Sequence, residues 1–313
     1  MALKRIVALA GGVGGAKLAL GLARALPPEA LTVVVNTGDD FSLYGLAISP
    51  DLDTVMYTLG GVANPESGWG LAGDSNQMLD MLRQYGEQPW FGLGDRDLAT
   101  HLLRTQWLAE GQSLTQVTAR LCRGLGIPQA ILPMSDDPVR TLVDTVEHGQ
   151  LAFQEYFVRH RWQPVVERIS YAGAAAARPG EAVLSALQAA DAVVICPSNP
   201  LLSIAPILAV PGMREAMGGK PVVAVTPIVA GGALKGPAAK LMGELGWVVS
   251  PASVAAYYGD LLDGFVLDQR DSSAFTQADF ACRMFVTETV MVSEQDRVRL
   301  AQQVVAWAEE ISR

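Results

Sequence analysis

A glycine-rich loop directly after a short apolar run is the feature that most constrains how this chain can fold. Residues 5–10 are expected to form a buried strand, Gly11-Gly-Val-Gly-Gly-Ala-Lys17 follows it, and residues 16–26 are expected to form a helix. After Pro27-Pro28, the valine-rich run 31–35 predicts a second buried strand. This β-α-β order predicts an α/β fold with a Rossmann-like, doubly wound and mainly parallel sheet.

The rest of the chain repeats the alternation of strands and helices. Further buried strands are predicted at 130–132, 192–196, 221–226 and 247–250, and a more exposed strand at 153–159. Between about 54 and 128 the apolar spacing is helical, which predicts a mostly helical insert or cap. Residues 291–313 are expected to form a terminal helix with Ser293 as its N-cap. Because no linker or repeat interrupts this order, we expect a single domain over residues 1–313.

The composition limits the partners of the protein. The chain carries 23 basic and 32 acidic residues, a net charge of −9, so a broad basic surface for nucleic acid is not expected. No apolar run approaches the roughly 18 residues that cross a bilayer, so no membrane partner is expected either. The three cysteines are far apart and form no CxxC pair, which is typical of reduced thiols in the cytoplasm. We therefore expect a cytoplasmic protein that acts on small molecules.

The glycine loop predicts a phosphate site, because glycines let the backbone approach closely and the following helix offers free amides. The Walker pattern is absent, since Ala16 precedes Lys17 and Leu18 follows it. The dinucleotide pattern is incomplete: Gly12 and Gly14 fit it, but Lys17 replaces the third glycine, which disfavours an NAD-dependent oxidoreductase. We expect the loop to hold a diphosphate, and a turn that only packs the helix on the sheet is the alternative.

Acidic residues gather in turn-like segments, where functional sites usually lie. These segments are Asn36-Thr-Gly-Asp-Asp40, Ser49-Pro-Asp-Leu-Asp53, Gly73-Asp74, Gly94-Asp-Arg-Asp97 and Ser135-Asp-Asp-Pro138. Asp39 and Asp40 close the second strand beside the glycine loop, where oxygen ligands suit Mg²⁺. We expect both to bind Mg²⁺ next to the diphosphate, with helix or turn capping as the alternative role. The cations in or near these segments that could offset phosphate charge are Lys17, Arg96, Arg104 and Arg140.

Two polar segments follow later strands and are expected at the same edge of the sheet. Ser198-Asn-Pro200 follows the strand 192–196, and Asn199 could read the edge of a base. The segment 226–232 follows the strand 221–226. The three histidines, His101, His148 and His160, lack metal-ligand spacing, and no Gly-x-Ser-x-Gly elbow is present. Zinc chemistry and a hydrolase triad are therefore poor fits, and phosphoryl chemistry is expected.

Six separated segments carry the most specific pattern of the chain. They are Gly11–Lys17, Asn36–Asp40, Ile48–Tyr57, Leu93–His101, Ile131–Val139 and Pro197–Pro200. In this order they resemble the signatures of one family, the 2-phospho-L-lactate transferases of coenzyme F420 biosynthesis. The resemblance implies transfer of a phosphorylated three-carbon acid from a guanosine diphosphate conjugate to the ribityl 5′-hydroxyl of the deazaflavin Fo, releasing GMP. It also implies a requirement for Mg²⁺ and leaves open whether the acid is lactate, enolpyruvate or glycerate; a homodimer is expected.

The resemblance also implies roles for individual residues. Asp53 and Gly92 would contact the deazaflavin, Gly92 through its backbone alone. The residues that would face the guanosine diphosphate are Gly11, Gly12, Gly14, Gly15, Lys17, Ser198 and Asn199. Asp53 is the candidate for orienting or deprotonating the hydroxyl, and Arg96 is expected to act at the phosphate. Trp90, with Tyr57 and Phe91, is expected to wall an apolar slot for the deazaflavin.

No nucleophile and base pair is evident, which favours direct in-line attack on phosphorus without a covalent enzyme intermediate. A non-enzymatic, nucleotide-sugar-binding regulator of the gluconeogenesis-factor type is the alternative function. The second-strand signature of that family ends in an Ala-Asp-Asp-Gly-Gly run, whereas this chain reads Thr37-Gly-Asp-Asp-Phe41 and keeps Asp51-Leu-Asp53. Bound deazaflavin would distinguish the transferase from the regulator.

Overall fold

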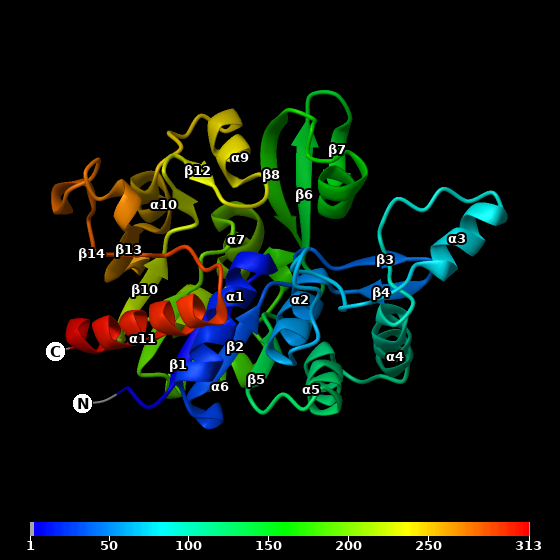
Figure 1. The fold of residues 1–313 in the computed structure, drawn as a ribbon, viewed down its shortest axis with the longest axis horizontal. Helices are drawn as coiled ribbons and strands as arrows, with labels where there is room; N and C mark the ends of the chain where they lie inside the picture. The colour runs from blue at the N-terminus through cyan, green and yellow to red at the C-terminus, as the bar shows by residue number, and fades with distance from the viewer. Residues whose placement is uncertain (1–2, 313) are drawn as a thin grey trace.

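The computed structural model of the protein describes residues 3–312 and is built around a seven-stranded parallel sheet (Figure 1). In the order β14-β13-β10-β9-β1-β2-β5, its strands span Arg283–Thr287, Gly264–Asp268, Val222–Val225, Ala192–Ile195, Ile6–Ala10, Leu31–Val35 and Ala130–Pro133. Five of these strands were predicted from the sequence, and the Rossmann-like, doubly wound α/β fold is confirmed. Residues 1, 2 and 313 of the predicted domain lie outside the described residues.

The strand order places a ligand-binding crevice between β1 and β9. From β1 the chain winds outward through β2 to β5, and it then fills the other side through β9, β10, β13 and β14. At such a reversal the loops after the two central strands diverge and leave a crevice at the carboxyl edge. Gly11 follows β1 and Ser198 follows β9, so both segments expected to bind a nucleotide lie at this point.

Helices cover both faces of the sheet, as a sheet with near-continuous apolar strands requires. One face is covered by α1 (Gly12–Ala25), α2 (Pro50–Leu59), α5 (Leu114–Gly124) and α11 (Glu294–Ile311). The other is covered by α6 (Glu181–Ala189), α7 (Ala205–Leu208), α8 (Met213–Ala216), α9 (Ala238–Glu244) and α10 (Pro251–Tyr258). Each face has its own apolar core, so the glycine loop is fixed between two packed layers.

The terminal helix α11 packs against α1. Gly21 permits the approach, because a Cβ at this position would meet the carbonyl oxygen of Arg297. The predicted N-cap is confirmed: Ser293 Oγ accepts from the Asp296 N–H at 3.1 Å. Neither α11 nor any other helix within residues 3–312 is both long enough and apolar enough to cross a membrane.

Between β2 and β5 the chain builds a lobe at the side of the sheet (right side of Figure 1). It contains the hairpin of β3 (Phe41–Leu43) and β4 (Leu46–Ile48), α3 (Gln77–Gln84) and α4 (Asp97–Ala109), while α2 and α5 of the same segment pack on the sheet. Ile48, Leu79 and Leu93 form its small apolar core. The predicted helical insert at 54–128 falls in this lobe, whereas the hairpin was not predicted.

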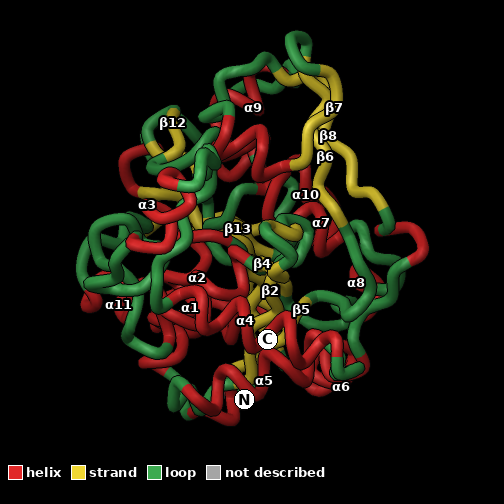
Figure 2. The backbone as a smooth tube through the Cα atoms, turned by 90° about the vertical axis from the view of Figure 1, so that its right-hand side faces the viewer, coloured by secondary structure: helices red, strands yellow, loops and turns green. Residues whose placement is uncertain are grey.

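A second insert, between β5 and β9, forms an antiparallel sheet that stands above the main one (Figures 1 and 2). Its strands are β7 (Gly149–Ala152), β6 (Arg140–Thr145) and β8 (Val166–Ala172), in this spatial order. The strand predicted at 153–159 is wrong, since Glu155–Arg159 form a π-helical turn. Phe153 and Tyr156 are both buried, and side chains three residues apart share a face in a helix rather than in a strand.

The strand predicted at 247–250 is also wrong. The Trp247 N–H donates to the Met242 carbonyl, Val248 is 74% exposed, and Ser250 caps α10. This run therefore connects α9 to α10, and β13 and β14 fill the edge of the sheet instead.

Candidate active site

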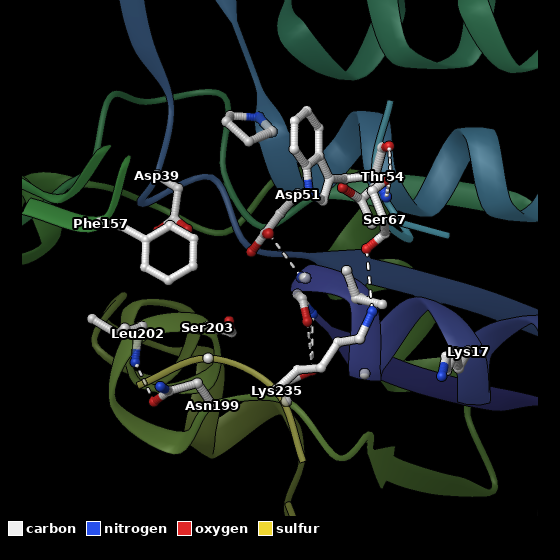
Figure 3. Close-up of a pocket in the computed structure, with 18 of the residues that line it drawn as sticks. Lys17, Asp39, Asp51, Thr54, Ser67, Phe157, Asn199, Leu202, Ser203 and Lys235 are labelled. Atoms are coloured by element: carbon white, nitrogen blue, oxygen red, sulfur yellow. Dashed lines mark hydrogen bonds between the residues drawn. The ribbon is translucent and has the colours of Figure 1, made fainter. Parts of the chain in front are cut away.

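The carboxyl edge of the sheet holds a cavity of about 760 Å³. It lies where the loops after β1, β9 and β10 meet, at the switch point of the sheet. Its walls are the glycine loop, α2, residues 67–70, 91–92, 197–203 and 289–292, and the hairpin of β11 (Ile228–Val229) and β12 (Gly232–Ala233). Figure 3 shows that acidic and basic side chains from distant parts of the sequence meet around this space.

The glycine loop and the segment after β9 hold each other in place. Ser198 Oγ donates to the Gly11 carbonyl at 2.8 Å and accepts from the Gly11 N–H at 3.1 Å. A Cβ at Gly14 would meet the carbonyl oxygen of Pro197, and one at Gly15 would meet Ser198 Oγ. Only glycine allows this close approach, which brings the start of α1 to the cavity.

Asn199 caps the π-helical turn Pro200–Ile204 in the cavity wall. Its Oδ1 accepts from the Leu201 N–H at 2.9 Å and from the Leu202 N–H at 3.1 Å, the second of which is drawn in Figure 3. Its carboxamide oxygen is therefore committed to the turn, and its Nδ2 group is the part that can donate to a ligand.

Asp51, in the first turn of α2, contacts the N-terminus of α1. Its Oδ1 accepts from the Gly12 N–H at 2.7 Å, and its Oδ2 accepts from Asn36 Nδ2 at 2.9 Å. The same Nδ2 donates to Asp39 Oδ1 at 3.1 Å, so one amide joins two carboxylates. Burial raises the pKa of Asp51 to about 6, and burial together with the charge of Asp51 raises the pKa of Asp39 well above its ordinary value. A cation near the pair would stabilise the ionised carboxylates.

Asp40, the other acid expected to bind the metal, lies outside the cavity wall, which Asp39 lines. Its Oδ2 accepts from Ser49 Oγ at 2.7 Å, whereas its buried Oδ1 has no hydrogen-bond partner within residues 3–312. Burial raises the pKa of Asp40 to about 7. The structure thus joins Asp39 to Asp51, an acid for which no role was predicted from the sequence.

The donor set around Asp39 fits Mg²⁺, which prefers one or two carboxylates and keeps several waters. Asp39 and Asp51 provide these carboxylates at the cavity. Asp53, Asp97 and His101 form a second cluster, with one ligand atom from each lying within 4.8 Å of the others. Asp53 already has a buried cationic partner, described next, so an added cation fits this second cluster less well.

A buried network lies on the α2 side of the cavity. Arg104 donates to both oxygens of Asp53, at 3.1 Å from Nη1 to Oδ2 and by a shorter contact from Nη2 to Oδ1. His101 lies between two acids, with Nδ1 3.7 Å from Asp53 Oδ2 and Nε2 3.1 Å from Asp97 Oδ2. The Tyr57 hydroxyl donates to Asp97 Oδ1 at 2.5 Å. Burial raises the pKa of Asp53 and Arg104 opposes this shift, while the ion pair fixes the orientation of the carboxylate.

The sequence contained a signal for part of this network. Asp97, His101 and Arg104 are spaced by four and three residues, so they share one face of α4. The sequence predicts that Arg104 offsets phosphate charge, but this side chain is 1% exposed and paired with Asp53. His101, which showed no metal-ligand spacing in the sequence, also lines the cavity.

Two lysines reach the cavity beside the glycine loop. Lys17 Nζ donates to the Met291 carbonyl at 3.0 Å, and Lys235 Nζ donates to the Ser67 carbonyl at 3.2 Å (Figure 3). Burial lowers the pKa of Lys17, and the charges of Arg297 and Lys235 lower it further. The cavity therefore has local positive charge although the chain as a whole is acidic.

The aromatic side chains at the cavity are only partly the expected ones. Tyr57, Phe91 and Gly92 line it, and so does Trp69, whose ring would lie 3.5 Å from a Cβ at Gly92. Trp90 does not line the cavity, because its ring packs edge-on against Phe91 at a centroid distance of 5.7 Å. The tryptophan that lines the cavity is therefore Trp69.

Arg96 and Arg140 do not line the cavity. Arg96 Nη1 donates to the Ala72 carbonyl at 2.9 Å, and Arg140 Nη1 donates to the Val139 carbonyl at 2.8 Å. The catalytic role expected for Arg96 does not follow from this geometry, because its guanidinium is hydrogen-bonded to an outer loop.

A parallel sheet with a glycine loop, lysines and acids at its switch point is the arrangement of the α/β nucleotide-binding enzymes. A model of the family described as 2-phospho-L-lactate transferase CofD matches residues 6–306. The chain therefore belongs to the 2-phospho-L-lactate transferase family, as its six motifs predicted. The family is one of transferases, which favours this function over the regulator and the oxidoreductase.

Named relatives resemble the chain over nearly its whole length. It is 44% identical over 315 residues to the phosphoenolpyruvate transferase of Streptomyces griseus, covering 98% of this chain and 99% of the relative. The phosphoenolpyruvate transferase of Thermobifida fusca is 47% identical over 281 residues, covering 86% and 87%. The 2-phospho-L-lactate transferase of Methanosarcina acetivorans is 42% identical over 301 residues, covering 96% and 98%.

The fold has a counterpart among solved structures. A member of the UPF0052 family from Bacillus halodurans matches with a TM-score of 0.62 at 16% identity, covering 97% of this chain and 99% of that one. At this identity the similarity concerns the fold alone.

Proposed function

We propose that the protein transfers a phosphoenolpyruvyl group from its guanosine diphosphate conjugate to the ribityl 5′-hydroxyl of the deazaflavin Fo. The hydroxyl oxygen forms a bond to the phosphorus that carries the acid, and the anhydride bond to GMP breaks. The hydroxyl proton passes to Asp53 or to water. One observation carries the proposal: a single cavity joins a glycine loop suited to a diphosphate to a pocket with acidic and aromatic walls.

The two ends of the cavity suit the two substrates. The N-terminal amides of α1, with Lys17, favour the diphosphate of the donor. Tyr57, Trp69 and Phe91 provide an apolar wall for the flat deazaflavin, near Asp53. In-line attack then requires little from the protein beyond holding the hydroxyl and the phosphorus in register.

Mg²⁺ is proposed to bind at Asp39 and Asp51. When bound, it would neutralise charge that develops on the departing GMP. Asp40 remains a second candidate, since its Oδ1 has no partner in the described part of the chain.

Enolpyruvate is proposed as the acid because two relatives named phosphoenolpyruvate transferases are 44% and 47% identical to this chain. The relative from Methanosarcina acetivorans, named for 2-phospho-L-lactate, is 42% identical. Such acids differ by a hydroxyl or a double bond, so one or two polar contacts decide between them.

The experiment that tests the function mixes the protein, Mg²⁺ and Fo with equal amounts of the enolpyruvyl, lactyl and glyceryl donors. Mass analysis should then find mainly the dehydro form of coenzyme F420-0. A product carrying lactate or glycerate would correct the acid. Absence of any product, together with unchanged Fo absorbance on titration, would contradict the transferase function and favour the regulator.

The oligomeric state and location remain predictions. We propose a homodimer in the cytoplasm, and light scattering of the purified protein would measure its mass against the monomer mass of 33.2 kDa.

A further inference from the structure

The hairpin β11–β12 carries a lysine that the sequence analysis did not single out. Lys235 follows this hairpin, and its side chain extends past the start of α1 toward Ser67 (Figure 3). Its Nζ donates to a backbone carbonyl 168 residues away in the chain. The contact links two walls of the cavity, those formed by residues 67–70 and by the hairpin.

Lys235 and Lys17 line the same cavity. Each ammonium donates to a backbone carbonyl, and neither lies in an ion pair with a carboxylate among residues 3–312. Their charges interact, because Lys235 contributes to the lowered pKa of Lys17. Two like charges at the positive end of α1 repel each other, and an anion with several negative oxygens would remove this repulsion.

The turn of the hairpin is anchored, whereas the segment that follows β12 is open. The Ala230 N–H, in the turn between β11 and β12, donates to both oxygens of Asp271, at 3.0 and 3.1 Å, which anchors this turn. Gly236, which directly follows Lys235, has a φ angle of +74°, and a Cβ on it would meet nothing within 4 Å. The segment carrying Lys235 therefore has room to adjust to a ligand without disturbing the sheet.

We propose that Lys235 is a second cation for the diphosphate of the guanosine donor, facing Lys17 across the glycine loop. A phosphate oxygen replaces the Ser67 carbonyl as the acceptor of its Nζ group, and the segment after β12 that carries Lys235 adjusts to the bound diphosphate. This inference rests on the proposed function and adds a residue to its donor site.

The test is calorimetric titration of the whole protein, in Mg²⁺, with GDP and separately with guanosine. Lys235→Met should weaken GDP binding about tenfold or more, the effect of losing one charge-assisted contact. Guanosine binding should stay unchanged, and Lys235→Arg should keep most of the GDP affinity. The matched control is Lys220→Met, since Lys220 also donates to backbone carbonyls, at 3.0 and 3.2 Å, but lies outside the cavity.

The outcomes separate this inference from the proposed function. GDP affinity within twofold of the unaltered protein in Lys235→Met, together with a loss in Lys17→Ala, would overturn the role of Lys235 alone. Equal losses for GDP and guanosine would show that the hairpin acts through its shape, which also overturns it. An unaltered protein that binds no GDP would contradict both the inference and the proposed function.

Discussion

The two sides of the cavity hold their charged groups in opposite ways. On the side of the glycine loop, Gly11 and Ser198 are joined by two hydrogen bonds. The ammonium groups of Lys17 and Lys235 donate to backbone carbonyls. On the side of α2, Asp39, Asp51 and Asp53 are buried, and burial raises the pKa of each. The first side offers donors to an anion, whereas the second concentrates negative charge out of water.

This difference shows how an acidic protein can bind a polyanion. A diphosphate next to Asp39 and Asp51 would be repelled unless a cation lay between them. In the proposed reaction the lysines and the N-terminus of α1 would attract the phosphates, and a divalent cation would make the acids compatible with them. Asp53 does not need that cation, because Arg104 already balances its charge. The following predictions test this division.

Removal of the divalent cation is expected to have the largest effect. Treatment with EDTA should abolish transfer, and Mg²⁺ should restore it. Asp39→Asn and Asp51→Asn should each lower kcat by about a hundredfold or more, the usual cost of losing one group that stabilises the transition state, and Asp40→Asn should lower it less. Asp144→Asn is the control, since this acid pairs with Arg168 at the surface. If transfer continued at the full rate after EDTA treatment, Asp39 and Asp40 would have only the structural role of capping turns or helices.

Loss of Arg104 is expected to destabilise the fold. Arg104→Met leaves the Asp53 carboxylate buried without its partner, which costs roughly 3–5 kcal/mol. Urea unfolding measures the change, and Asp53→Asn in the same chain should recover part of it. Arg168→Met, which breaks an exposed pair, should cost less than about 1 kcal/mol. If Arg104→Met and Arg168→Met both lowered the free energy of unfolding by a similar small amount, the Arg104–Asp53 pair would contribute no more than an exposed pair does.

Lys17 and Asp53 are expected to affect different steps. Lys17→Ala should weaken GDP binding roughly tenfold to a hundredfold through the loss of a charge-assisted contact. Asp53→Ala should leave GDP affinity nearly unchanged while transfer to Fo falls sharply. Calorimetry and a product assay on both variants check this. Equal loss of GDP affinity and transfer in Asp53→Ala would place Asp53 on the donor side.

Stability is expected to fall as pH rises from about 4 to 7. Burial raises the pKa of Asp51 to about 6 and of Asp40 to about 7, so the native state holds protons that the unfolded chain has already released. The stabilising contribution is complete below the unfolded pKa of about 3.9 and is lost through the native values; it amounts to roughly 3 kcal/mol for Asp51 and roughly 4 kcal/mol for Asp40. Scanning calorimetry should show a flatter profile for Asp40→Asn. The measurement is made without Mg²⁺. If the dependence of stability on pH were the same in Asp40→Asn as in the unaltered protein, the raised pKa of Asp40 would be contradicted.

Arg96 is expected to have the smallest effect. Its guanidinium donates to the Ala72 carbonyl and does not line the cavity, so Arg96→Ala should change kcat by less than about threefold. Steady-state kinetics with Fo measures this. A hundredfold loss would restore the catalytic role predicted from the sequence and would require the segment around residue 96 to move toward the substrate.

Much of the fold could be predicted because the central strands are short apolar runs followed by glycine or proline. The run 247–250 has the same composition but lies between two helices and serves as a connection. Conversely, β14 is an edge strand with no fully buried residue, so its pattern gave no clear signal. Composition indicates which runs can be strands, but only the available place in the sheet decides which of them pair.

The candidate site likewise has one part that the sequence predicts and another that only tertiary contacts decide. The sequence by itself determined the glycine loop after β1, the acids after β2 and the segment after β9, since strand order and local turn chemistry place all three at one edge. Tertiary structure alone decided the partners: Gly12 with Asp51, Asp53 with Arg104, and Lys235 with Ser67. These contacts join residues 39, 51 and 168 positions apart. Periodicity and spacing report neighbours within a turn or a strand, whereas such contacts exist only once the packed layers have brought distant segments together.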